Sequence, residues 1–240
     1  MPTLYIHFPK MLIYDTPSHI TAFSTTRDGG VAIQIPTLYM PSHQVHGTRT
    51  VIIDDTFTHL SPLEQVILTE GADALSTDLP NVGVCVKTAD CIPVLLWDDK
   101  TNVVSAVHAG WKGTLQRIVE ANIDVLRSTY GTRSEDLHAI IGPGIGMDSF
   151  EVGEEVYDMF AKALFPMDKL ARLYPGMKNS LESRWHIDLW ECNRLQLTGK
   201  GVSPDHIHIA GIDTYANSDK FYSARRHGNG RIINGIVRTQ

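Results

Sequence analysis

The stretch KTADCIPVLLWDDKTNVVSAVHAGWKGT, from Lys87 to Thr114, decides the fold that the sequence predicts. It contains two short apolar runs, IPVLLWD and NVVSAVHAG, of the kind that form buried strands. The first run begins directly after Cys91 and the second ends near His108, at positions where turn-forming residues are usual. We therefore expect both reactive side chains at one edge of a sheet.

The rest of the chain intermixes strands and helices. Apolar residues recur at helical spacing from Leu115 to Leu126, which predicts a helix that starts at Gly113 and Thr114. Because strands and helices do not alternate strictly, we expect mixed sheets covered by helices instead of a doubly wound sheet. Further helices are predicted over residues 152–164 and 188–201, and further strands over residues 4–8, 20–26, 50–54, 82–88, 206–211 and 231–239.

The composition is that of an ordinary globular protein. The 240 residues are 42% hydrophobic and 20% charged, and no linker or repeat divides residues 1–240, so one α/β domain is expected. A net charge of −6 argues against a nucleic-acid partner, and no apolar stretch approaches the ~20 residues that span a bilayer. Three cysteines without framework spacing and no signal-peptide pattern lead us to expect a cytoplasmic location.

A histidine is the third group expected at a strand edge. In SHQVHGTRT, His43 and His46 precede the strand that starts near Thr50. A lone histidine or cysteine is more often structural, but two imidazoles and a thiolate brought together by folding form a His₂Cys metal site with an open position. Such ligands suit zinc or copper. The steps of 45 residues from His46 to Cys91 and 17 from Cys91 to His108 exclude a zinc-finger spacing.

The loop AGWKGT follows His108 and opens the next helix. A helix start leaves backbone N–H groups unpaired and carries a partial positive charge, so it can hold an anion. Lys112 adds a full positive charge, and the two glycines let a ligand approach the backbone. The alternative is a plain strand-to-helix turn capped by Thr114.

Seven motifs occur in order along the chain: QVHG (44–47), ADALSTDLP, TADCIPVLL, AVHAGWKGT, IGPGIG…FEVGEEV, IDLWECNRLQL and FYSARR. Together they closely resemble the laccase-domain, or polyphenol-oxidase-like, family, whose members are described as purine nucleoside phosphorylases. The resemblance implies a single domain of mixed sheets in a layered α/β/β/α arrangement. The family's metal-binding catalytic site is formed by the histidine of QVHG, the cysteine of ADC and the histidine of HAGW, which implies His46, Cys91 and His108 here.

The resemblance also implies an activity. Adenosine, inosine and S-methyl-5′-thioadenosine would be cleaved by phosphate to a free base and ribose 1-phosphate, with some deamination of adenosine. The partners would be purine nucleosides and phosphate, and the metal would be zinc, with copper as the alternative. Deamination needs an acid/base group, for which Asp90 is a candidate. Phosphate needs a cationic cradle, and the candidates are Arg225, Arg226 and Lys112.

The GPGIG loop, from Gly142 to Gly146, follows the predicted strand LHAII and is expected beside the same pocket. Glycine is favoured where a ligand crowds the backbone, and Pro143 stiffens the turn, so Gly144 is a candidate for substrate binding. The alternative is a plain surface turn. We expect His43 near the metal without ligating it.

Two stretches depart from the family pattern. Members usually carry a long segment between the GG turn and QVHG, whereas about a dozen residues join Gly30 to His43 here. Members usually also have a cysteine ahead of a tyrosine before FYS, where this chain has Asp213 and Thr214. Both changes bear on substrate preference more than on the three expected ligands.

Three alternatives stay open. Cys91 could be a nucleophile with His108 as its base, which would make a cysteine hydrolase that survives chelation of metals. A copper-dependent polyphenol oxidase would need histidines in paired motifs, whereas the 11 histidines here are scattered. A non-catalytic metal-binding module would bind metal tightly without turnover. For the enzyme, a monomer or a homodimer is expected.

Overall fold

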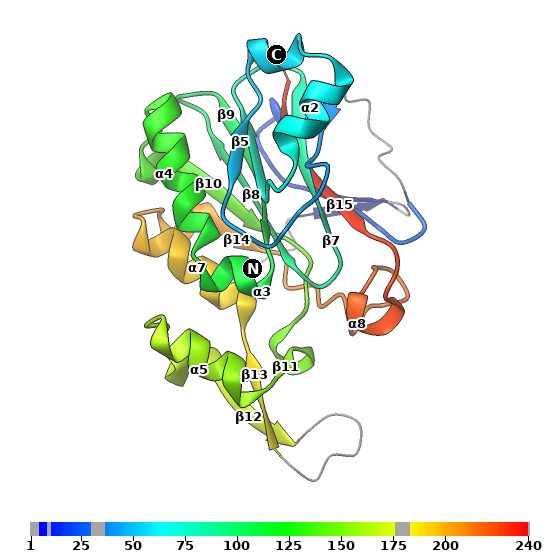
Figure 1. Cartoon of the computed structure of the whole chain (residues 1–240), viewed down its shortest axis with the longest axis vertical. Helices are drawn as coiled ribbons and strands as arrows, with labels where there is room; N and C mark the ends of the chain where they lie inside the picture. The colour runs from blue at the N-terminus through cyan, green and yellow to red at the C-terminus, as the bar shows by residue number, and fades with distance from the viewer. Residues whose placement is uncertain (1–4, 9–10, 30–36, 176–182, 240) are drawn as a thin grey trace.

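Two six-stranded sheets pack face to face in the computed structural model, which describes residues 5–8, 11–29, 37–175 and 183–239 (Figure 1). The first sheet has the order β1-β2-β3-β15-β7-β4 and is antiparallel except where β4 pairs with β7. Its strands are β1 (Tyr5–Phe8), β2 (Met11–Tyr14), β3 (Ile20–Thr25), β4 (Thr37–Tyr39), β7 (Val82–Thr88) and β15 (Ile232–Arg238).

The second sheet has the order β14-β10-β8-β9-β6-β5. It is antiparallel at its centre and parallel at both edges, so both sheets are mixed, as the sequence predicts. Its strands are β5 (Thr50–Ile52), β6 (Ala74–Thr77), β8 (Ile92–Asp98), β9 (Val103–Ala109), β10 (Leu137–Ile141) and β14 (Ile207–Ile209).

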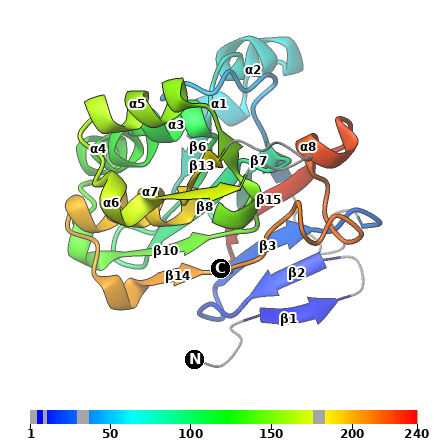
Figure 2. The same ribbon diagram turned by 90° about the horizontal axis from the view of Figure 1, so that it is seen from below.

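The central strands of the second sheet are buried on both faces, which explains their continuous apolar runs. Every residue of β8 and β9 is buried. Along β8, alternate side chains enter two different cores: Val94 and Leu96 pack with the helices, and Leu95 packs with the first sheet. The helices on this face are α3 (Trp111–Leu115), α4 (Ile118–Tyr130) and α7 (Leu189–Gly199), and Figure 2 shows them above the sheet.

Short helices and a small third sheet complete the domain. Phe57 of α1 packs edge-on against Tyr39 of β4, with 5.3 Å between ring centroids. The third sheet, β11-β13-β12, carries α5, and Tyr157 of that helix stacks on Trp185 with 4.0 Å between centroids. The expected single α/β domain of layered mixed sheets is confirmed. The remaining elements are α1 (Asp55–Thr58), α2 (Pro62–Thr69), β11 (Glu151–Val152), α5 (Glu154–Lys162), α6 (Met167–Leu170), β12 (Ala171–Pro175), β13 (Ser183–Ile187), α8 (Ala224–His227) and three 3₁₀ turns at Ser134–Asp136, Met147–Ser149 and Pro204–His206.

The helix expected to start at Gly113 is two helices in the structure. Between α3 and α4, Arg117 takes a left-handed backbone conformation with φ 63°. Its guanidinium fixes this corner, because it donates to the Ala163 carbonyl at 2.9 Å and lies 4.6 Å from the centroid of the Phe165 ring. The apolar period continues through the corner, since residues on both sides of it pack into one core.

The prediction omits α2, although the sequence carries a signal for its start. The Ser61 side chain accepts from the Glu64 backbone, and the Glu64 carboxylate accepts from the Ser61 backbone N–H at 2.8 Å. Pro62 occupies the first turn, where its missing N–H costs nothing. Within the described residues, the helices are all too short or too polar to cross a membrane.

Candidate metal centre and its pocket

Three side chains from separate parts of the chain meet at one end of the second sheet. Cys91 directly precedes β8 and His108 lies near the end of β9, in an antiparallel register that pairs Ile92 with Ala109. His46 comes from the loop before β5. One ligand atom from each of the three side chains lies within 4.8 Å of the other two. The structure therefore brings together the trio that the sequence singles out.

Gly110 leaves room for this convergence. A Cβ atom added at Gly110 would lie 2.7 Å from His46 Cδ2 and 3.0 Å from Cys91 Sγ. Carbon atoms do not approach each other or sulfur so closely without strain, so any larger residue would displace two of the three groups. The glycine of the HAGW motif thus shapes the centre directly.

A buried carboxylate orients two of the three groups. Asp73 is fully buried, and its Oδ1 lies 2.8 Å from His108 Nδ1. The same carboxylate accepts from the backbone N–H of His46 at 2.9 Å and from that of Gly47 at 2.7 Å. Because Nδ1 of His108 is engaged by Asp73, Nε2 is the nitrogen left for a metal. These bonds also hold His46 in a left-handed conformation with φ 62°.

The three groups also influence one another's protonation. Burial disfavours the Cys91 thiolate, but hydrogen bonds with His108 and His46 outweigh burial and lower the pKa of the thiol to about 7. Burial also disfavours the His108 imidazolium, but hydrogen bonds with Asp73 and Cys91 raise its pKa to about 9. The centre therefore favours the thiolate, which is the form that binds metals and attacks electrophiles.

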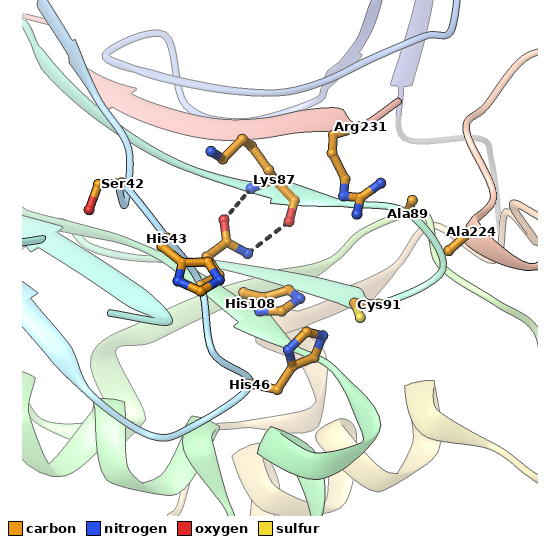
Figure 3. Close-up of a pocket in the computed structure, with 10 residues that line it drawn as sticks. Ser42, His43, His46, Lys87, Ala89, Cys91, His108, Ala224 and Arg231 are labelled. Atoms are coloured by element: carbon orange, nitrogen blue, oxygen red, sulfur yellow. Dashed lines mark hydrogen bonds between the residues drawn. The ribbon is translucent and has the colours of Figure 1, made fainter. Parts of the chain in front are cut away.

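The trio lines an open cavity of about 390 Å³ (Figure 3). Cavities of this size accept small molecules. Across the cavity from the trio, Figure 3 shows Lys87 of β7 and Arg231, which directly precedes β15. We call His46, Cys91 and His108 the His–Cys–His wall, and Lys87 and Arg231 the cationic wall. The other lining residues are Ser42, His43, Gln44, Ala89 and Ala224.

Gln44 ties the loop that carries His46 to strand β7. Its Nε2 donates to the Lys87 carbonyl at 2.8 Å, and its Oε1 accepts from the Lys87 N–H at 2.8 Å, as the dashed lines in Figure 3 show. These are the two bonds that a neighbouring strand would make. One side chain therefore connects the two walls through the backbone.

His43 lies at the edge of the pocket and is not one of the three closely spaced groups. Its Nδ1 lies 3.2 Å from Glu70 Oε1, and the Ser42 hydroxyl donates to the other carboxylate oxygen of Glu70 at 2.9 Å. The histidine and its carboxylate are both exposed. This pairing fixes the orientation of an imidazole that borders the cavity.

Asp90, the predicted acid or base, does not line the cavity. Its Oδ1 accepts from the Thr214 hydroxyl at 2.8 Å. Its Oδ2 accepts from the Ser223 hydroxyl at 3.0 Å and from the Arg225 backbone N–H at 2.9 Å. A buried carboxylate with three donors serves to hold the C-terminal segment against the turn before Cys91.

The three predicted phosphate ligands also lie outside the cavity lining. The Arg225 guanidinium donates to two backbone carbonyls, at 2.6 and 3.4 Å. The Arg226 guanidinium lies 4.0 Å from the centroid of the Tyr215 ring, and Lys112 is exposed on α3. The cations that the structure does bring to the cavity are those of the cationic wall.

The GPGIG loop packs against the segment that carries Cys91, on the side of the domain that the sequence predicts. A Cβ atom at Gly144 would collide with Ile92 Cδ1 and lie 3.1 and 3.2 Å from the carbonyl oxygens of Asp90 and Cys91. Gly144 itself does not line the cavity. Its N–H donates to the Ile212 carbonyl, and its carbonyl accepts from the Thr214 N–H. Glycine is needed here for close packing of two loops.

The two departures from the family pattern have different outcomes. The segment from Gly30 to His43 lies partly outside the described residues, because 30–36 are not among them. Asp213 and Thr214 both bind other side chains: Asp213 accepts from the Ser149 hydroxyl at 2.5 Å, and Thr214 donates to Asp90. They tie loops together next to the GPGIG loop.

Sequence reasoning missed four residues of the site: Gln44, Lys87 and Arg231, which line the cavity, and Asp73, which is buried behind His108. In chain order these are Gln44, Asp73, Lys87 and Arg231. The first two stand inside the quoted motifs QVHG and ADALSTDLP, so a polar residue within a motif was the available signal. Lys87 is a charged residue near the end of an otherwise apolar run. Arg231 has no local signal, because its place at the cavity depends on the pairing of β15 with β7.

Known proteins share both the sequence pattern and the fold. A family described as multi-copper polyphenol oxidoreductase laccase matches residues 15–239. A purine nucleoside phosphorylase of Bacteroides thetaiotaomicron is 40% identical over 206 residues, which cover 85% of this chain and 74% of the relative. Adenosine deaminase RL5, from an unknown prokaryotic organism, is 36% identical over 210 residues, which cover 87% of this chain and 78% of the relative. The crystal structure of YlmD from Geobacillus stearothermophilus has the same fold, with a TM-score of 0.83 and 24% identity over 100% of both chains.

Proposed function

The chain belongs to the family described as multi-copper polyphenol oxidoreductase laccase, and from this membership we propose that it is a metal-dependent purine nucleoside phosphorylase. Relatives of this chain are named purine nucleoside phosphorylase and adenosine deaminase, so the chain is an enzyme that processes nucleosides. The proposed substrates are adenosine, inosine and S-methyl-5′-thioadenosine, which react with phosphate to give a free purine base and a ribose 1-phosphate. Deamination of adenosine is proposed as a second activity of the same site.

The observation that carries this proposal is the convergence of His46, Cys91 and His108 on one wall of a small-molecule cavity. Imidazole and thiolate are both zinc ligands, and three protein ligands with one open position are the pattern of catalytic zinc sites. Gly110 and Asp73 support the fit, since the first keeps the ligand atoms close and the second holds the imidazole of His108 in one tautomer.

Zinc is the proposed metal. Copper takes the same ligands, but a multi-copper oxidase needs several ligand groups. Within the described residues, the His–Cys–His wall is the one group of three or more potential ligands that lie close enough to share an ion. When bound there, the ion would supply a Lewis acid and a means of activating water.

Phosphorolysis sets the demands on the other pocket residues. An oxygen of hydrogen phosphate bonds to C1′ of the ribose while the bond from C1′ to the purine nitrogen breaks. The electron pair of the broken bond stays with the purine, which takes up the proton that the phosphate loses. The protein must therefore hold an anion beside the sugar and let a proton reach the base. His43, oriented by Glu70 at the pocket edge, is placed to carry such a proton.

A cysteine hydrolase is the second candidate function. The lowered pKa of Cys91, about 7, and the neighbouring pair of His108 and Asp73 favour it, because a nucleophilic thiolate needs such a base and such an orienting carboxylate. A hydrolase of this kind stays active after chelation, whereas a metal-dependent phosphorylase does not. The three free cysteines favour a reducing compartment such as the cytoplasm for either enzyme.

One experiment tests the proposal. The purified protein is analysed for bound metal and then incubated with adenosine, with and without phosphate, before and after chelation. Stoichiometric zinc, and adenine with ribose 1-phosphate formed only when phosphate is present, support the phosphorylase. Inosine formed without phosphate supports the deaminase activity. Nucleoside turnover that persists in a metal-free sample would favour the cysteine-based alternative.

A further inference from the structure

Lys87 and Arg231 reach the cavity from neighbouring strands. β7 and β15 are antiparallel, and Lys87 lies opposite Ile233. Arg231 precedes Ile233 by two residues, so it lies diagonally across from Lys87 on the same face of the sheet. Long side chains at such diagonal positions can reach a common ligand. Figure 3 shows both side chains on the side of the cavity opposite His46 and Cys91.

The charges of these two side chains are not balanced locally. Among the residues that the structure describes, neither side chain forms an ion pair, and the guanidinium of Arg231 donates to the adjacent Gly230 carbonyl at 2.7 Å. The described residues that line the cavity include no carboxylate, although the chain has 27 Asp and Glu residues and a net charge of −6. An acidic protein with a locally cationic cavity attracts an anion to that place.

Other cations of the chain are placed differently. Lys100 pairs with Asp136 at 2.6 Å, Arg117 with Glu120 of α4 at 2.7 Å, and Arg194 with Glu191 of α7 at 2.5 Å. These pairs neutralise surface charge and leave no cation for a ligand. Lys87 and Arg231 combine a position in a cavity with the absence of such a partner within the described residues.

We propose that Lys87 and Arg231 form an oxyanion subsite that binds inorganic phosphate, the co-substrate of the proposed phosphorolysis. The inference rests on the proposed function for the identity of the anion. The planar guanidinium of Arg231 can donate two parallel hydrogen bonds to phosphate oxygens, and the ammonium of Lys87 adds a point charge. In Figure 3 Arg231 extends toward the side of Cys91 and Lys87 extends toward the side of Ser42, so the flexible Lys87 chain would turn toward Arg231 to share an anion across the cavity from the metal ligands.

The backbone of the subsite is held in place even though its side chains are long. Gln44 makes two hydrogen bonds to the backbone of Lys87, both 2.8 Å long, and β15 pairs with β7 along six residue positions from Ile232↔Thr88 to Val237↔Gly83. The origins of both side chains are therefore fixed relative to His46, which follows Gln44 by two residues. The anion subsite and the metal ligands would therefore contact a substrate between the two walls at two points a fixed distance apart.

The test measures phosphate binding directly, apart from turnover. The full-length, metal-loaded protein is titrated with inorganic phosphate by calorimetry, and the apparent KM for phosphate is measured in phosphorolysis. Lys87→Gln and Arg231→Gln are compared with Lys100→Gln and Arg133→Gln, which remove surface cations that have carboxylate partners. We expect each subsite variant to bind phosphate roughly ten- to a hundredfold more weakly, with unchanged metal content and an unchanged melting temperature. The surface variants should bind phosphate as the unmodified chain does.

An Arg231→Lys variant adds a graded comparison, because it keeps the charge and loses the planar fork. It should bind phosphate with an affinity between those of the unmodified chain and Arg231→Gln. Phosphate binding that is absent from the unmodified chain, or equal in all variants, overturns the subsite. If the unmodified chain binds phosphate at this wall and cleaves no nucleoside, the subsite stands and the proposed phosphorylase function fails.

Discussion

The two walls of the pocket are built in opposite ways. On the His–Cys–His wall, His108 is 3% exposed, its partner Asp73 is fully buried, and Gly110 leaves no room for one additional carbon atom. On the cationic wall, Lys87 is only partly buried and Arg231 is exposed. Their charged ends have no carboxylate partner in the described part of the chain.

This difference separates two tasks. Ligand atoms that must share one ion need positions fixed to within a fraction of an ångström, which buried packing and hydrogen bonds supply. An anion held by charge tolerates more movement, because electrostatic attraction weakens gradually with distance. Changes on the first wall should therefore abolish function, and changes on the second should weaken it by degrees.

The largest expected effect comes from Cys91→Ser. Serine has a similar size, but its hydroxyl stays protonated near neutral pH and is a poor zinc ligand. The variant should lose bound metal, phosphorolysis and deamination together, as shown by metal analysis and product assays. The loss should exceed the roughly 10- to 100-fold effect of removing an outer partner of a metal ligand. If the variant keeps its metal but loses activity, Cys91 acts as a catalytic nucleophile and not as a metal ligand.

The next effect concerns the carboxylate behind the wall. Asp73→Asn keeps the shape of the side chain but replaces one of its two acceptor oxygens with an NH₂ group. The donors that now share two oxygens, including His108 Nδ1 and the His46 N–H, would then have only one. Metal affinity should fall roughly 10- to 100-fold, measured by competition with a chromophoric chelator. Asp78→Asn, at an exposed position five residues along, is the matched control and should bind metal normally. Equal affinity in both variants would mean that Asp73 does not orient the ligands.

A third prediction uses the pH dependence of cysteine alkylation in the metal-free protein. The pKa of Cys91 is lowered to about 7, whereas burial raises the pKa of Cys85 to about 12 and also raises that of Cys192. Cys91 should therefore react selectively at pH 7, where about half of it is thiolate, and should lose reactivity roughly tenfold per pH unit below that. Peptide mapping after a short treatment with iodoacetamide measures this, and zinc should protect Cys91. Equal labelling of the three cysteines would contradict the contrast.

The smallest effect is expected for Arg226→Ala. The guanidinium of Arg226 lies against the Tyr215 ring and does not line the cavity. Its loss should change the apparent KM for phosphate by no more than about twofold, the usual scale for a surface substitution. A tenfold or greater increase in the apparent KM for phosphate would mean that Arg226 of the FYSARR motif binds phosphate, which would contradict the assignment of phosphate to the cationic wall.

The fold was predictable from the sequence where strands are buried on both faces. β7 and β8 begin and end at the predicted residues, because five of the seven residues of β7 and all seven of β8 are buried, and such strands read as nearly continuous apolar runs. The short strands β12 and β13 were not predicted, since a three-stranded sheet with one exposed face needs few apolar residues. The break at Arg117 was hidden as well, because packing on both sides of it follows one apolar period.

The part of the site that was predictable from the sequence consists of residues that stand within motifs at the ends of strands. Cys91 directly precedes β8 and His108 lies near the end of β9, and because these two strands form a hairpin the proximity of the two residues follows from local pairing. The sequence analysis chose Arg225 and Arg226 as phosphate ligands because they stand in the FYSARR motif. Arg231 reaches the cavity because β15 pairs with β7, a strand roughly 150 residues earlier in the chain. No local sequence pattern reveals such a long-range contact. Asp73 was missed for a related reason: its role depends on the backbone of a loop that is distant in the sequence.

The two hydrogen bonds of Gln44 fix the distance between the two walls of the pocket through the backbone of Lys87. Rotation of side chains cannot bring the two walls closer, because the loop that carries His46 is registered on β7 like an additional strand. A chain adapted to a larger or smaller substrate would have to change this registration, whereas substitutions at Lys87 or Arg231 alone would change which anion is held. Size selection and charge selection are thus assigned to different residues and can diverge independently in evolution or in design.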